Sequence, residues 1–164
     1  MSLEKWYISG IDVTQLDMPY STAGLPGEKF NYHLGEGEGW SPVKTKLKIS
    51  PENQIKWIKT TFDFNLEDSL RFPLRLRIQG KHNAHIFLNG VYIGKYWGRY
   101  GPQYNFYLMD GLLFNKENVL TIACWTIEET DISLSIEPYK IEEESGNLNE
   151  QGKIFITKYK NKHN

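Results

Sequence analysis

The chain has 164 residues, of which 40% are hydrophobic, 14% aromatic and 24% charged, and its formal net charge is −1. A chain of this length buries roughly 68–70% of the surface of its unfolded form, which suffices for one core without disulfides or metals. Nineteen basic residues against twenty acidic ones give no global attraction to nucleic acid or to an anionic membrane, so neither is expected as a partner.

The first forty residues are predicted to be loops that cross the ends of a sandwich, because prolines and glycines punctuate them.

Met1–Trp6 lacks the apolar stretch of a signal peptide. No segment approaches the run of about 18 apolar residues that spans a bilayer. The sequence therefore predicts a soluble protein, with the cytoplasm favoured.

Strands are predicted wherever apolar residues alternate with polar ones, since a period of two marks a half-buried strand. Five runs show this alternation, at residues 43–49, 57–64, 74–78, 120–124 and 132–136. No long stretch has a helical period. Short strands without crossover helices favour an antiparallel sandwich or barrel.

The strongest local signal is Asn89-Gly90, which lies between two β-rich runs in residues 84–94. Both residues tolerate the positive φ angles of a type I′ turn, so the pair predicts a two-residue hairpin. A further strand is expected at residues 104–108. The domain is then predicted to comprise residues 1–140, followed by a polar loop or linker at 141–152 and, at 153–164, a final strand with a frayed tail.

Residues of the kind that carry out catalysis are present but are not in convincing arrangements. Cys124 stands in an apolar strand, where an inert buried thiol is expected. His82 and His85 are three positions apart, which places them on opposite faces of a strand and disfavours a shared metal. Glu36 and Glu38 offer a carboxylate pair of the kind that a hydrolase needs, although a surface turn is the favoured interpretation. A structural calcium ion bound by one of the acidic clusters is an open alternative, and no other cofactor is expected.

The segment from Ile93 to Tyr107 is dense in aromatic and planar polar side chains. Three aromatic residues offer flat faces with polar rims, and three polar residues offer planar hydrogen-bonding groups: Trp97, Tyr100 and Tyr104, with Arg99, Gln103 and Asn105. Sugar rings need this combination, because their CH faces stack on aromatics while their hydroxyls pair with planar groups. Trp40 is expected to line the same end. The alternative is a rigid loop whose aromatics plug the end of the sandwich.

Several motifs in this order resemble the jelly-roll domain of β-galactosidases. They are Trp57-Ile-Lys-Thr-Thr-Phe62, Pro73-Leu-Arg-Leu-Arg-Ile78, His85-Ile-Phe-Leu-Asn-Gly-Val-Tyr-Ile-Gly-Lys-Tyr-Trp97, Gly101-Pro-Gln103, Phe106-Tyr-Leu108, Gly111-Leu-Leu113 and Glu117-Asn-Val-Leu120. The resemblance covers about residues 57 to 125. It implies a galactose-binding-like jelly-roll β-sandwich. It also implies that the family's catalytic residues lie in a separate (β/α) barrel.

These observations predict a non-catalytic, carbohydrate-associated domain whose ligand is a sugar, with galactose-containing sugars the first to test. The alternative is a scaffold that docks on a glycosidase catalytic domain or another protein partner, because Tyr, Trp and Arg are also enriched at protein interfaces. A small hydrolase that uses Glu36 or Glu38 is the third hypothesis.

Overall fold

The fold is described from a computed structural model of the chain. The structure describes residues 5–12, 25, 27–44, 46–51, 54–64 and 73–138. The predicted linker at 141–152 and the predicted last strand and tail at 153–164 lie outside the described residues.

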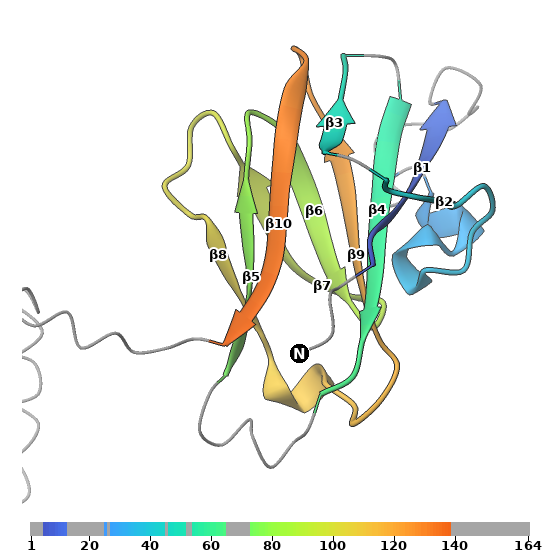
Figure 1. Cartoon of the computed structure of the whole chain (residues 1–164), viewed down its shortest axis with the longest axis vertical. Coiled ribbons are helices and arrows are strands. Elements are labelled where there is room, and N and C mark those ends of the chain that lie inside the picture. Colours follow the sequence, from blue (N-terminus) through green and yellow to red (C-terminus); the bar gives the residue numbers. More distant parts are fainter. Residues whose placement is uncertain are drawn as a thin grey trace, which may run out of the picture.

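The strands form two antiparallel sheets that face each other (Figure 1). The six-stranded sheet has the order β2 (Ser41–Pro42), β1 (Tyr7–Asp12), β4 (Gln54–Phe62), β9 (Asn118–Trp125), β6 (Asn83–Leu88) and β7 (Val91–Trp97). The four-stranded sheet has the order β3 (Leu47–Ile49), β10 (Thr130–Pro138), β5 (Leu74–Gln79) and β8 (Asn105–Leu108). The all-β sandwich predicted from the sequence is confirmed, and its finer assignment to a jelly roll stays a prediction.

Helical structure in the described ranges consists of single 3-10 turns: η2 (Glu28–Phe30), η3 (Tyr32–Leu34) and η4 (Asp110–Leu112). None of these turns has the length or the apolar character needed to cross a membrane. The turns η2 and η3 lie against the six-stranded sheet, and η4 lies at one end of the sandwich (Figure 1).

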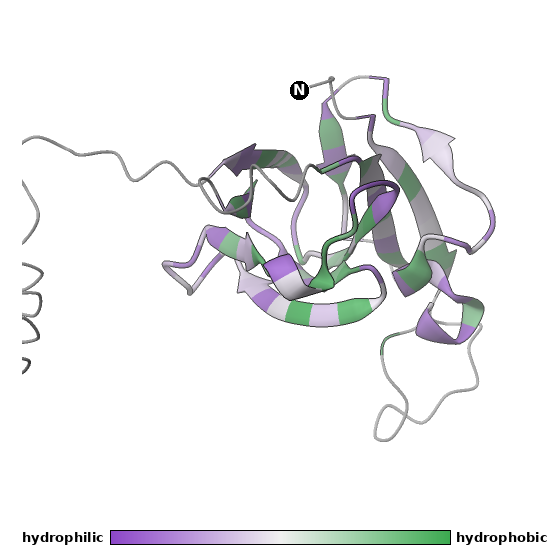
Figure 2. Cartoon of the chain, turned by 90° about the horizontal axis from the view of Figure 1, so that it is seen from below, coloured by the Kyte–Doolittle hydropathy of each residue, from purple (hydrophilic) through white to green (hydrophobic). Residues whose placement is uncertain are grey.

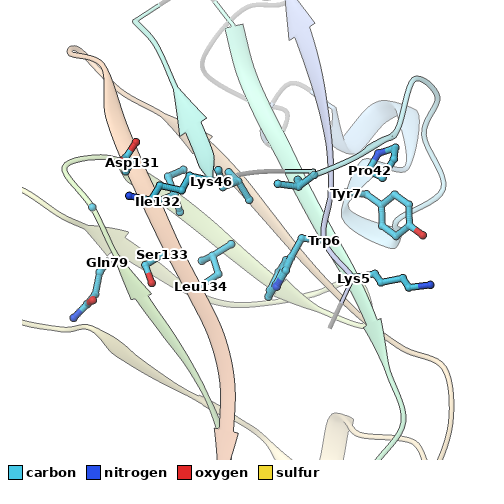
Figure 3. A pocket seen from close by; sticks show the side chains of 13 residues that line it. Lys5, Trp6, Tyr7, Pro42, Lys46, Gln79, Asp131, Ile132, Ser133 and Leu134 are labelled. Atoms are coloured by element: carbon cyan, nitrogen blue, oxygen red, sulfur yellow. The ribbon is translucent and has the colours of Figure 1, made fainter. Parts of the chain in front are cut away.

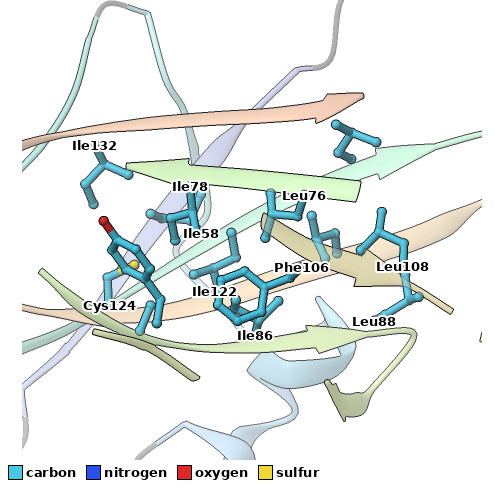
Figure 4. Packing of buried hydrophobic residues seen from close by; sticks show 14 of the residues in the cluster. Ile58, Leu76, Ile78, Ile86, Leu88, Phe106, Leu108, Ile122, Cys124 and Ile132 are labelled. Carbon is cyan, nitrogen blue, oxygen red and sulfur yellow. The ribbon is translucent and has the colours of Figure 1, made fainter. Parts of the chain in front are cut away.

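The core lies between the sheets and is built from the alternating residues that the sequence indicates. Leu74, Leu76 and Ile78 of β5 are buried, as are Leu120, Ile122 and Cys124 of β9. The alternation appears as bands of hydropathy along the strands (Figure 2). The apolar side chains of both sheets meet in the space between them (Figure 4). Their burial is the main favourable term in folding.

The predicted hairpin is confirmed, because β6 and β7 pair antiparallel around Asn89 and Gly90. Both turn residues have positive φ, 49° and 81°, as a type I′ turn requires. The Asn89 side chain also ties the hairpin to β9. Its Oδ1 accepts from the Val119 N–H at 2.7 Å, and its Nδ2 donates to Asn118 Oδ1 at 3.0 Å.

The prediction that the first forty residues are loops was wrong for Tyr7–Asp12, which form β1 and pair over their whole length with residues 54–59 of β4. Each face of this segment carries at most two apolar or aromatic residues, so its alternation is weak. Gly10 weakens the strand signal further. The predicted strand at 43–49 is also shorter than expected. The chain leaves the six-stranded sheet after Pro42, where the Val43 N–H donates to the Trp6 carbonyl at 2.9 Å, and joins the other sheet at Leu47.

Residues 27–40 cover part of the outer face of the six-stranded sheet. The Tyr32 ring lies 5.9 Å from the ring of Trp57, and Trp57 lies 5.7 Å from Phe87. Gly27 has a φ of 111°, and a Cβ there would lie 2.3 Å from Trp57 Nε1. Only glycine fits both the left-handed backbone and the close approach. Trp57 is therefore completely buried although it points away from the main core.

Candidate functional site

The loop that follows β7 is fixed to the turn between β5 and β6. The Gly80 carbonyl accepts a hydrogen bond from Tyr96 Oη at 2.8 Å. The Gly98 N–H donates to the His82 carbonyl at 2.9 Å, and a Cβ on Gly98 would lie 2.0 Å from the Gly80 carbonyl oxygen. The backbone of Gly101 then folds back to donate to the Trp97 carbonyl at 2.9 Å. These contacts anchor the loop to the turn between β5 and β6.

The aromatic residues of this region divide into a buried and an exposed set. Tyr96 is buried and packs edge-on to Phe106, with ring centroids 6.5 Å apart. Trp97, Tyr100 and Tyr104 expose 44%, 80% and 44% of their surface. Tyr96 therefore belongs to the core between the sheets, while the other three aromatic side chains reach solvent, as the sugar-binding hypothesis requires.

Three of the predicted site residues line one shallow concavity of about 380 Å³: Trp97, Tyr100 and Gln103, together with Lys95, Gly101 and Pro102. The Lys95 ammonium lies 4.3 Å from the centroid of the Trp97 ring, a cation–π distance. Gln103 Nε2 donates to the Asn105 carbonyl at 3.3 Å. The concavity thus combines two aromatic side chains, an amide and a cation.

The other predicted site residues lie outside this concavity. Arg99 turns towards the loop after β9, where its Nη2 is 3.0 Å from Glu128 Oε2. Tyr104 and Asn105 are exposed at the start of β8, and the Tyr104 ring packs 6.5 Å from Tyr96. Trp40 is not brought to this end of the molecule. Its ring packs 5.3 Å from Tyr32 and lies under the Lys59 ammonium of β4, three strands from β7.

A second, larger concavity of about 870 Å³ lies at the open edge of the sandwich, between the start of β1 and β10 (Figure 3). Trp6 and Leu134 supply apolar surface, and Lys46, Gln79, Asp131 and Ser133 supply polar groups. We refer to it as the edge groove. Sequence reasoning missed it because its walls come from segments far apart in the chain. The adjacent aromatics Trp6 and Tyr7 near the N-terminus were the available signal.

The groups considered for catalysis lie in an ordered turn and in the core. Asn31 Nδ2 donates to Glu36 Oε2 at 3.1 Å, and the Glu38 carbonyl accepts from Tyr32 Oη at 2.7 Å, so both glutamates belong to an ordered turn. Cys124 is completely buried, and burial raises the pKa of its thiol. In the described ranges, no three His, Cys, Asp or Glu side chains gather closely enough to hold a metal ion.

The two histidines occupy different environments, as their spacing predicts. His82 is 1% exposed, its ring lies 4.9 Å from that of Tyr96, and burial lowers its pKa to about 4. His85 lies on the outer face of β6 between Tyr92 and Trp125, at 5.2 Å and 5.3 Å. Burial, followed by the neighbouring Lys95 ammonium, lowers the pKa of His85.

Comparison with known proteins gives consistent similarities. A family model described as the second all-β domain of β-galactosidase matches residues 31–130. Probable β-galactosidase C of Penicillium rubens is 32% identical over 127 residues, which cover 71% of this chain and 13% of that protein. Probable β-galactosidase C of Aspergillus fumigatus is 29% identical over 126 residues, covering 71% and 12%. Probable β-galactosidase E of Aspergillus fumigatus is 26% identical over 125 residues, covering 67% and 12%. The chain therefore spans about an eighth of the length of these relatives.

Proposed function

The chain belongs to the family of the second all-β domain of β-galactosidases, and on this basis we propose that it is a non-catalytic accessory domain of a glycoside hydrolase that binds sugar. The ligand we propose is a galactose-containing carbohydrate, in keeping with the names of the relatives. The binding residues are those of the concavity after β7.

The observation that supports this proposal most is the placement of Trp97, Tyr100 and Gln103 around one concavity on a fixed loop. A sugar that stacks on the exposed rings would replace water on an apolar CH face, while the Gln103 amide would pair with a hydroxyl. Because the loop is already held by Gly80 and Gly98, little conformational entropy is lost on binding. Affinity is expected to be modest, since the site is shallow.

The test is a heteronuclear NMR titration of the 164-residue chain with galactose, lactose and β-galactan oligosaccharides. We expect saturable shifts at Trp97, Tyr100 and Gln103. Trp97→Ala and Tyr100→Ala are expected to weaken binding by about tenfold each, because each removes a stacking face. Phe114→Ala is the matched control, since Phe114 is an exposed aromatic in the loop after η4. A folded protein with no shifts across the panel would contradict the proposal.

A second candidate function, docking on another domain of a larger enzyme, is supported by the edge groove. Among the described strands, β10 pairs with β3 only over Thr130–Ile132, so Ser133–Pro138 leaves one edge without a strand partner on that side. A free strand edge beside apolar surface is suited to the addition of an extended segment. The groove would receive a strand from a neighbouring domain.

This second candidate is tested in a chimera in which the chain replaces the matching segment of the Penicillium rubens protein. Leu134 lines the groove and is only partly buried in the isolated domain. If the groove is occupied, Leu134→Lys lowers the thermal midpoint of the chimera further than that of the isolated chain, because a charge is then buried at an interface. Equal shifts in the two proteins would reject docking at this groove.

A further inference from the structure

The outer face of the six-stranded sheet is covered on one half and open on the other. Over the covered half, residues 27–40 pack on Trp57, and the His33 carbonyl accepts from Thr121 Oγ1 at 2.9 Å. The His33 ring reaches Phe87 at 6.0 Å. Beyond this contact, towards the edge strand β7, aromatic side chains of the outer face remain partly exposed.

Strand register places two tryptophans in one row of the open half. Asn83 of β6 pairs with Trp97 of β7 on one side and with Trp125 of β9 on the other. Their sequence neighbours Ala84, Tyr96 and Cys124 are buried in the core, so this row points outward. Since neighbouring strands are about 4.8 Å apart, the two tryptophans are attached roughly 10 Å apart.

Polar groups lie between and beside these rings. The Lys95 ammonium is 4.3 Å from the Trp97 ring centroid and 5.9 Å from that of Trp125. In the adjacent row, His85 contacts Trp125 at 5.3 Å and Tyr92 at 5.2 Å. Tyr92 is 49% exposed. The open half thus carries separated aromatic surfaces, with an ammonium, an amide and an imidazole among them.

We infer that this open face extends the concavity after β7, so that the domain binds a linear glycan chain across Trp97 and Trp125 and not only a single sugar. The inference rests on the proposed function, because Trp97 and Lys95 belong to both surfaces. One pyranose ring cannot cover two tryptophans attached two strands apart. Successive sugars of one chain reach both, with Asn83 and His85 placed to pair with hydroxyls between them.

The composition of the face favours a glycan as its occupant. Polar groups interrupt the aromatic surfaces, whereas the centre of a protein interface is depleted of charged residues. Lys95 can leave the Trp97 ring when a sugar arrives, because a cation–π contact at an exposed site is weak. Because the open face continues into the loop after β7, the glycan has a defined starting point at Trp97.

The inference is tested by isothermal titration calorimetry of the 164-residue protein with galactose, the β-galactan disaccharide and longer β-galactan oligomers. The affinity is expected to rise by about tenfold from the disaccharide to the longer oligomers, as the second tryptophan is engaged. Trp125→Ala is expected to reduce the affinity for the longer oligomers to that for the disaccharide, and to leave disaccharide binding unchanged. Asn83→Ala is a milder second variant, expected to lose part of the gain. Phe114→Ala again serves as the control.

The outcomes distinguish binding across the open face from binding in the concavity after β7. Unchanged disaccharide binding by the Trp125→Ala protein shows that the variant is folded, so a lost chain-length effect is then assigned to the open face. Equal affinity for all chain lengths in the unmodified protein, or an unaffected gain in both variants, overturns the inference and leaves the single-sugar site standing. No binding by any member of the series overturns the proposed function and the inference together.

Discussion

Replacing His82 with phenylalanine is expected to remove much of the acid sensitivity of this domain. His82 is 1% exposed, and it packs against the Tyr96 ring beside Gly80. Neither of its ring nitrogens has a hydrogen-bond partner in the described protein atoms. Phenylalanine keeps the ring contact and removes the titrating group, and His82→Leu is a smaller second variant in case the larger ring overpacks the site.

The size of the effect follows from the pKa. Burial lowers the pKa of folded His82 to about 4 from its usual 6.5. Between these values the unfolded chain binds the proton and the folded one does not, so the free energy of unfolding falls as the pH falls through this window. One pKa unit corresponds to about 1.4 kcal/mol, so the loss reaches about 3 kcal/mol near pH 4. Above pH 6.5 both states are neutral and no loss occurs.

The assay is urea unfolding at a series of pH values from neutral down to pH 4. The unmodified protein is expected to lose about 3 kcal/mol more than His82→Phe over this range. Other groups such as His85 and Glu137 also have lowered pKa values, but they are shared by both proteins and cancel in the difference. If both proteins lose equal stability between neutral pH and pH 4, the assignment of acid sensitivity to His82 is wrong.

Three further predictions concern the framework. Asn118→Ala is expected to lower the free energy of unfolding, measured in urea, by about 3 kcal/mol. The buried Asn118 amide accepts from the Phe114 N–H and donates to the Phe114 carbonyl, and the variant leaves both backbone groups without this partner. A loss below about 1 kcal/mol would contradict this role. Gly27→Ala is expected to lower the free energy of unfolding by about 3 kcal/mol in the same measurement, since the left-handed backbone and the adjacent Trp57 ring leave no room for a Cβ. An unchanged urea midpoint would show that residues 27–40 repack without loss of stability. Cys124 is expected to react with a thiol reagent only after the domain unfolds, because it is completely buried, and rapid labelling of the native protein would refute its burial.

Two of the motifs that carry the family resemblance meet in the structure. The hairpin residue Asn89 and Asn118 of the Glu117–Leu120 motif are joined by a hydrogen bond, and both also bind nearby backbone groups. These motifs therefore specify how β6, β7 and β9 fit together. The candidate sugar site depends on them indirectly, since β7 carries Lys95 and Trp97 to the surface.

Sequence alone determined the fold class, the hairpin and the aromatic segment after it. Alternation in β5, β9 and β10 and the Asn89-Gly90 turn are local signals, because a strand shows its buried face every second residue and a type I′ turn selects its residues directly. The role of Cys124 as a buried thiol followed from the same local pattern.

Only the tertiary structure decided which side chains share a surface. β1 has a weak pattern of its own and is fixed by pairing with β4. The sequence predicts one site for Trp40 and Trp97, yet Trp40 packs beneath Lys59 of β4, three strands from β7. Trp125, by contrast, shares a row with Trp97, because both pair with Asn83. The edge groove likewise brings Trp6 to Leu134. Sheet order and register set these distances, and both arise from contacts between residues remote in the chain, which no local pattern encodes.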